Sequence, residues 1–213
     1  MPDRGPWMQT FTGEAFYPFD PRYQEVNIID IASALSKQCR FAGHCKNFYS
    51  VAQHSVHVCK LVEGFCKKLN MSDYDISFYM LNALLHDAAE AYCLDFPHPI
   101  KIGLLEYTDI YKKLEHNIQN TIITALFDNI DKPKYLNITH MENMIHYCDN
   151  IALATEKRDN MGKSPMPWIE LPDPDSEFLI CYNHVTAYNM FIEKFNDLIN
   201  KLGGISNLDI YGE

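Results

Sequence analysis

The feature that most constrains the fold is a helical spacing of apolar residues that continues from residue 27 almost to the C-terminus. Apolar side chains recur every three or four residues in segments that begin at capping residues. Asn27 and the capping boxes Ser50–Gln53, Ser72–Asp75 and Thr139–Glu142 mark four helix starts. The alternation of residues 8–17 predicts one short hairpin. We therefore expect an all-α bundle with almost no strand.

Prolines and glycines divide the predicted helices. A helix is predicted from Ser72 to about Tyr92, and Pro97 and Pro99 prevent its continuation. The glycine and prolines of residues 159–175 predict a loop, either a lid or a plain surface connection. With residues 1–26 as an N-terminal extension, we expect a single domain over 1–213. Further helices are expected over 100–105, 108–127 and 183–202.

Composition excludes several classes of protein. The 213 residues are 47% hydrophobic and carry a net charge of −10, without a basic stripe that would suit nucleic acid or an anionic membrane. No apolar run approaches the roughly 20 residues that cross a bilayer, and residues 1–7 lack the apolar part of a signal peptide. The seven cysteines contain no Cys-x-x-Cys pair, which favours reduced thiols. We therefore expect a cytoplasmic protein, in the host cytoplasm if a phage encodes it.

Four polar side chains fall on faces that the helical spacing predicts to be buried: His54, His86, Asp87 and Asp149. On its own, His54 would more often be a core histidine that hydrogen-bonds a carbonyl. A buried aspartate is harder to explain, because an ionised carboxylate in a core needs a partner or a metal. The sequence therefore predicts that the two histidines and the two aspartates converge on one cation.

The predicted ligand set mixes nitrogen and oxygen donors. This set suits one divalent transition metal, with Zn, Co or Mn expected first and Mg or Fe as further candidates. A closed structural zinc site is disfavoured, because such sites recruit cysteines at short spacing. We expect His86 and Asp87 on a helix, where adjacent side chains diverge by about 100°. Both could still reach an ion lying between those directions.

The distant His54, the adjacent His86-Asp87 and the distant Asp149 resemble the H…HD…D pattern of the HD-domain phosphohydrolases. The surrounding residues 48–55 and 83–92 are similar to the branch that holds the bacterial 5′-deoxynucleotidases and the phage dATP triphosphohydrolases. The resemblance covers about residues 27–160. It implies an HD-domain helical bundle in which these four residues bind the metal.

The resemblance also implies two catalytic carboxylates. Glu90 corresponds to the family's catalytic glutamate, expected one turn after His86 on the same helix face. Asp95 corresponds to an acidic group that positions water or substrate. Judged without the resemblance, Glu90 could be a surface carboxylate and Asp95 could cap the following turn.

Five residues are implied in substrate binding. Arg40 matches an arginine that contacts the 5′-phosphate, and Lys101 stands where relatives use lysine for phosphate oxygens. Phe41 replaces a tryptophan that packs on the sugar, which puts sugar discrimination in doubt. Phe41, Ala42 and Pro99 could form an apolar slot for a purine. Taken singly, the two cations are more often solvated and Phe41 more often lies in a core.

The resemblance leaves three functions open. The first, which we expect, is a deoxynucleoside triphosphate triphosphohydrolase that prefers dATP and releases deoxyadenosine and triphosphate. The second is a 5′-deoxynucleotidase acting on monophosphates, and the third is a noncatalytic nucleotide-binding HD protein. The chain lacks the surrounding motifs that we would expect in a stringent-response alarmone hydrolase. The expected partners are a small deoxynucleotide and further copies of the chain, in a dimer or hexamer, with no nucleic acid and no membrane.

Overall fold

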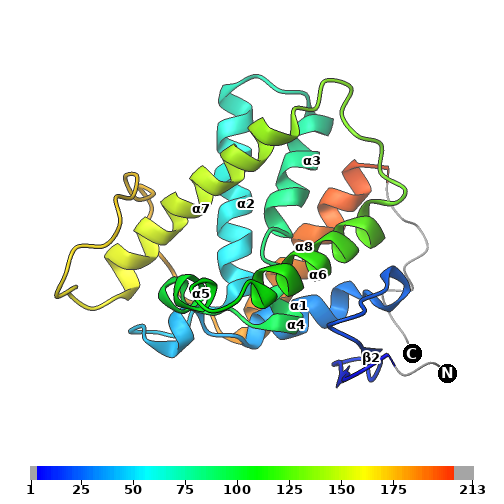
Figure 1. The fold of residues 1–213 in the computed structure, drawn as a ribbon. Helices are drawn as coiled ribbons and strands as arrows, with labels where there is room; N and C mark the ends of the chain where they lie inside the picture. The colour runs from blue at the N-terminus through cyan, green and yellow to red at the C-terminus, as the bar shows by residue number, and fades with distance from the viewer. Residues whose placement is uncertain (1–3, 204–213) are drawn as a thin grey trace.

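The computed structural model describes residues 4–203, which form eight α-helices and one two-stranded sheet (Figure 1). The prediction of an all-α fold with a short N-terminal hairpin is confirmed. The elements follow the order β1 (Met8–Gln9), β2 (Ala15–Phe16), η1 (Tyr23–Glu25), α1 (Ile28–Lys37), η2 (Arg40–Gly43), α2 (Val51–Lys68), α3 (Asp73–Leu84), α4 (Glu90–Cys93), α5 (His98–Leu105), α6 (Ile110–Phe127), α7 (Ile138–Asn160) and α8 (His184–Lys201).

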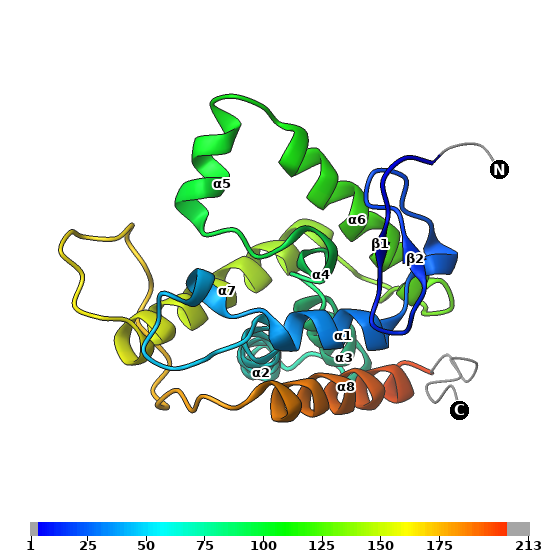
Figure 2. The same ribbon diagram turned by 90° about the horizontal axis from the view of Figure 1, so that it is seen from below.

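The small sheet is an antiparallel hairpin in which Met8 pairs with Phe16. Phe16 is fully buried and stacks on Tyr92 of α4, with ring centroids 3.7 Å apart. This contact fixes the hairpin at the end of the molecule away from residues 161–183 (Figure 2).

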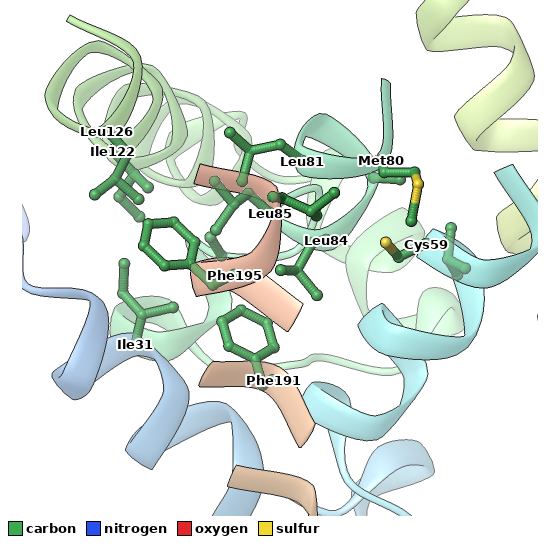
Figure 3. Packing of buried hydrophobic residues seen from close by; sticks show 14 of the residues in the cluster. Ile31, Cys59, Met80, Leu81, Leu84, Leu85, Ile122, Leu126, Phe191 and Phe195 are labelled. Atoms are coloured by element: carbon green, nitrogen blue, oxygen red, sulfur yellow. The ribbon is translucent and has the colours of Figure 1, made fainter. Parts of the chain in front are cut away.

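The core surrounds the α2–α3 pair. Helix α2 packs against α3, α7 and α8, and α1 packs against α8 and α4. Figure 3 shows apolar side chains from several elements meeting beneath the C-terminal end of α3. Leu84 and Leu85 are fully buried there, near Phe191 and Phe195 of α8. Since α3 ends in this cluster, the residues that follow it are held firmly by the core.

Three of the predicted helix starts are confirmed and one is wrong. Asn27, Ser50 and Ser72 each accept a hydrogen bond from a backbone N–H of the first helical turn. The capping box at Thr139–Glu142 does not form. Asn137 caps α7 instead and accepts a hydrogen bond from the His140 N–H at 3.0 Å. Asparagine is at least as good an N-cap as threonine, so the helix begins earlier than predicted, at Ile138.

The prediction of one continuous helix from Ser72 to about Tyr92 is also wrong. Helix α3 ends at Leu84, residues 85–89 form turns, and α4 is a separate short helix. Gln119 of α6 satisfies backbone groups at this break. Its amide donates to the Leu85 carbonyl at 2.7 Å and its oxygen accepts from the Ala89 N–H at 3.0 Å. His86 and Asp87 therefore lie in a turn, and Glu90 begins a new helix rather than sharing a helix face with His86.

The loop predicted over 159–175 is longer and begins later. Helix α7 continues to Asn160, and residues 161–183 form an irregular segment that leads to α8. Over the described part of the chain, no helix has the length and apolar character needed to span a membrane.

Candidate metal centre

His54 lies in the first half of α2 and is completely buried. Its Nδ1 atom is 2.7 Å from Oε1 of Glu156, which is equally buried in α7. An ionised carboxylate only accepts hydrogen bonds, so Nδ1 carries the hydrogen and donates it. The Nε2 lone pair is then directed away from Glu156. A carboxylate behind the imidazole in this way orients a metal-binding histidine.

His86 is held in the same manner from the turn after α3. Its Nδ1 is 2.7 Å from the Ala83 carbonyl oxygen, so Nδ1–H donates and Nε2 keeps its lone pair. The Nε2 atoms of His54 and His86 are both buried, and neither has a hydrogen-bond partner among residues 4–203. Two buried, unsatisfied ring nitrogens that face one region are what a metal site requires.

Two aspartates lie beside these ring nitrogens. Oδ2 of Asp87 is 3.2 Å from Nε2 of His86 and 3.6 Å from Nε2 of His54. Oδ1 of Asp149, on α7, is 3.1 Å from Nε2 of His54. Neighbouring ligands of a tetrahedral ion with bonds of about 2.1 Å lie about 3.4 Å apart. His54, His86 and Asp87 therefore fit a single divalent ion, because their donor atoms all lie within 4.8 Å of one another. Asp149 lies beside His54 but outside that group, so its role as the fourth ligand stays a prediction.

Electrostatics at this centre favour a cation. Burial and the nearby Arg40 oppose protonation of His54, but Glu156 and Asp149 outweigh them and raise its pKa to about 10. Burial also opposes ionisation of Asp87, yet His86 holds the pKa of that carboxyl well below its usual range. The same negative potential that favours a proton on the imidazole favours a metal ion in its place.

Glu156 is the residue that the sequence reasoning missed. Besides His54, it accepts a hydrogen bond from Nε of Arg40 at 2.9 Å. Burial alone would raise the pKa of Glu156, but Arg40 and His54 lower it. Glu156 follows Asp149 by seven residues, about two turns along α7, so the two carboxylates lie on the same side of the helix. That spacing was the available signal.

Arg40 is buried beside the centre, with a side chain only 11% exposed. Its Nη1 lies 3.9 Å from Oδ2 of Asp87 and 3.9 Å from Oδ2 of Asp95. Burial raises the pKa of Asp95, and Arg40 opposes that rise. The Asp95 N–H donates to Oε1 of Gln38 at 3.1 Å, so Asp95 is also fixed through its backbone. Arg40 and Asp95 thus lie together at the edge of the metal centre.

Glu90 lies at the start of α4, is 3% exposed, and binds Lys101 rather than solvent. Nζ of Lys101 is 2.8 Å from Oε1 of Glu90 and 2.8 Å from Oε1 of Glu115. Burial, with Asp87 and Asp95 nearby, raises the pKa of Glu90 well above its usual range against the effect of Lys101. Lys101 is therefore held between two carboxylates.

The three residues of the predicted apolar slot lie on two elements, η2 and α5. Phe41 and Ala42 belong to η2 and have left-handed φ angles of 58° and 51°, which non-glycine residues adopt at a cost. The Phe41 ring lies 6.3 Å from that of Trp168. Ala42 is exposed, and so is Pro99 in the first turn of α5. The aromatic neighbour of Phe41 is thus Trp168, which the sequence reasoning did not consider.

Two comparisons with known proteins agree with this geometry. The family described as 5′-deoxynucleotidase YfbR-like matches residues 35–162, which include every residue of the metal centre. The chain is also 37% identical to an uncharacterised protein, YfdR, of Escherichia coli strain K12 over 196 residues, which cover 90% of this chain and 95% of YfdR.

These matches identify the class first: the chain is a nucleotide phosphohydrolase of the metal-dependent HD superfamily. Within that superfamily it belongs to the YfbR-like 5′-deoxynucleotidase family.

Proposed function

We propose that this protein hydrolyses the 5′-phosphoester of 2′-deoxynucleoside monophosphates to a deoxynucleoside and phosphate. The observation that carries the proposal is the pair of unsatisfied Nε2 atoms of His54 and His86, flanked by Asp87 and Asp149. The family to which the chain belongs supports the same substrate class.

The metal is proposed to be Zn, Co or Mn, with Mg or Fe as further candidates, because the donors are two imidazoles and two carboxylates. When bound, such an ion lowers the pKa of a water molecule and polarises a phosphate oxygen. His54 and His86 are kept in the metal-binding tautomer by Glu156 and by the Ala83 carbonyl. The carboxylates of Asp87 and Asp149 are 23% and 32% exposed, so a ligand can reach them from solvent.

Arg40 is proposed to neutralise charge on the substrate phosphate. It is held by Glu156 at 2.9 Å and faces Asp87 and Asp95, so its guanidinium is already oriented before substrate arrives. Positioned cations of this kind account for much of the catalysis of phosphoryl transfer. Phe41, which follows Arg40, is proposed to pack on the nucleoside with Ala42 and Pro99.

Glu90 and Asp95 are proposed to orient the attacking water and to hold its proton. Both carboxyls are buried beside the ligand Asp87, and burial raises the pKa of each. A carboxyl whose pKa is raised in this way is suited to proton transfer near neutral pH. Lys101 fixes Glu90, and its contacts with Glu90 and Glu115 use two of its three N–H donors, which leaves one for a phosphate oxygen.

The triphosphohydrolase that the sequence favoured, preferring dATP, stays a prediction beside this proposal. A triphosphate needs more positive charge than a monophosphate, whereas Arg40 and Lys101 are both already paired with carboxylates. This charge balance supports the monophosphate.

The test is to incubate the purified protein with each common dNMP and dNTP in the presence of Mn, Co, Zn or Mg, and to separate the products by chromatography. Orthophosphate released from monophosphates supports the proposal. Inorganic triphosphate released from dATP would instead support the triphosphohydrolase. Absence of turnover with every metal would contradict both and leave a noncatalytic nucleotide-binding protein.

A further inference from the structure

A cavity lies beside the C-terminal end of α7, on a different face of the helix from the metal centre. Its volume is ≈ 560 Å³, and three of its lining residues come from α7: Ala154, Lys157 and Arg158. At 100° per residue these three share one helix face, about 130° from the face that carries Asp149, Glu156 and Asn160. The body of α7 therefore separates this cavity from the proposed metal ligands.

The residues that line the cavity are strongly biased in charge. Four are cations, Lys46, Lys157, Arg158 and Lys163, and no aspartate or glutamate is among the lining residues. The whole chain has a net charge of −10, so such a cluster is unlike the rest of the molecule. Positive charge concentrated in a concave site attracts anions.

Arg158 shapes the cavity wall. Its guanidinium binds both carboxylate oxygens of Asp159 at 2.7 Å. It also donates to the carbonyl oxygens of Asp175 at 2.6 Å and Glu177 at 2.8 Å, which ties the irregular segment 161–183 to α7. The positive charge of Arg158 is thereby already balanced.

The three lysines remain available. Within residues 4–203, none of them forms an ion pair with a carboxylate. Nζ of Lys46 donates only to the Asp159 carbonyl oxygen, at 3.4 Å, and Nζ of Lys157 lies 5.1 Å from the ring centroid of Trp168. Lysines that lack carboxylate partners can bind phosphate oxygens without first breaking an ion pair.

Trp168 supplies a flat apolar surface in the same cavity. Its indole is half-buried, and Phe41 supports it from η2. Base stacking on an aromatic side chain tolerates any base, because every base has a π face. A volume of ≈ 560 Å³ is also within the ordinary range of ligand pockets.

We propose that this cavity is a second nucleotide site, with the phosphates among Lys46, Lys157 and Lys163 and the base against Trp168. The proposal is independent of the function proposed for the metal centre, because it requires binding and no turnover.

Trp168 provides its own probe, since the chain has only two tryptophans. Trp7 is 59% exposed, so Trp7→Phe leaves Trp168 as the single indole fluorophore in the full-length protein. ATP is the probe ligand, compared with adenosine and with inorganic triphosphate, and chromatography confirms that the ATP is intact. We expect saturable quenching by ATP, and binding of adenosine or triphosphate at least tenfold weaker.

Three variants in the Trp7→Phe background locate the site. Lys157→Gln with Lys163→Gln should weaken ATP binding at least tenfold. The matched pair Lys132→Gln with Lys134→Gln makes the same charge change near the other end of α7, about 30 Å along the helix, and should leave the affinity unchanged. Asp149→Asn should also leave it unchanged.

Four results would overturn the proposal. They are absence of quenching by ATP, unaltered binding in the Lys157→Gln/Lys163→Gln protein, loss of binding in Asp149→Asn, and equal affinity for ATP and inorganic triphosphate. The third would place the ligand in the metal centre, and the fourth would reduce the cavity to a site for inorganic anions. None of these results depends on whether the metal centre hydrolyses deoxynucleotides.

Discussion

The face of α7 that meets α2 buries its charged side chains, whereas the face toward residues 162–174 leaves its cations at the surface of a cavity. On the first face, Glu156 is fully buried and accepts hydrogen bonds from the imidazole of His54 and the guanidinium of Arg40. On the second, Lys157 contacts only the ring of Trp168 among the described interactions.

One helix can therefore carry buried carboxylates on one face and exposed lysines on another. A buried carboxylate must be paired, because desolvation without a partner costs several kcal/mol. An exposed lysine needs no partner and stays available to a ligand. The side chains on the face toward α2 are therefore held in a fixed arrangement that suits a metal. The lysines on the other face have no ion-pair partner in the described part of the chain and remain available to an anion.

The largest expected effect comes from a change on the face of α7 that meets α2. Asp149→Asn replaces a proposed anionic ligand with a neutral amide. Loss of metal-based stabilisation is worth several kcal/mol, so turnover of the best dNMP should fall by roughly 10³-fold or more. Product chromatography and metal content by mass spectrometry measure this. The control is Asp197→Asn, an exposed carboxylate on α8 that pairs with Lys201. Unchanged metal content and turnover in Asp149→Asn would remove Asp149 from the ligand set.

The next effect separates two roles on this face: binding the metal, and holding a metal-binding residue in place. Glu156→Gln keeps the size of the side chain but removes the charge that orients His54 and Arg40. Loss of such an outer carboxylate should weaken metal affinity by about 10- to 100-fold. Competition with a chromophoric chelator measures this affinity in protein whose folding is checked by circular dichroism.

The matched control for this variant is Glu170→Gln, which lies in the exposed segment after α7. A purely structural role for Glu156 would lower the melting temperature and leave the metal affinity of the folded protein unchanged. That outcome would contradict the positioning role.

The first face could largely be predicted from the sequence. Buried polar residues at apolar positions are rare enough to stand out. His54, His86 and Asp87 do bring their donor atoms together, and Asp149 lies beside His54. Glu156 could not be singled out from the sequence, because a single glutamate on a long helix is usually exposed. Its meaning appears only when Arg40, 116 residues away, is seen beside it.

The break between α3 and α4 and the second face could not be predicted. Residues 83–92 read as one helix, and what interrupts them is Gln119, which is distant in sequence and satisfies the exposed backbone groups. Lysines such as Lys157 and Lys163 are ordinary surface residues by composition. They line one cavity only because residues of the segment 161–174 lie beside the end of α7. Both features depend on tertiary contacts between segments that are distant in the sequence.

A smaller effect tests how the second face is held together. Asp159 accepts from Arg158 and from the Leu179 N–H, and the Arg158 hydrogen bond lowers the pKa of Asp159 below its usual value of 3.8. Because the pKa in the folded protein is lowered, this anchor is complete above about pH 3.8 and is lost as the pH falls through the lowered value. Trp168 fluorescence in the Trp7→Phe protein should therefore be constant from pH 7 to pH 5.

Asp159→Asn should remove the same anchor at pH 7 and increase trypsin cleavage after Lys163 several-fold, because local opening becomes easier. The control is Asp109→Asn, which breaks an exposed ion pair with Lys113 on α6. Equal cleavage of the two variants would show that Arg158 and Asp159 do not hold the segment.

The smallest effect concerns the start of the helix that carries both faces. Asn137→Ala removes the side chain that caps α7 and should lower the free energy of unfolding by about 1 kcal/mol. Thr139→Ala alters the residue that the sequence favoured as the cap, and it should change stability by less than about 0.5 kcal/mol. Urea denaturation of the two variants measures the difference. If Thr139→Ala proved the more destabilising, α7 would begin later than the Asn137 hydrogen bond indicates. Because the cap lies far from both sites, metal affinity and ATP binding should remain unchanged in either variant.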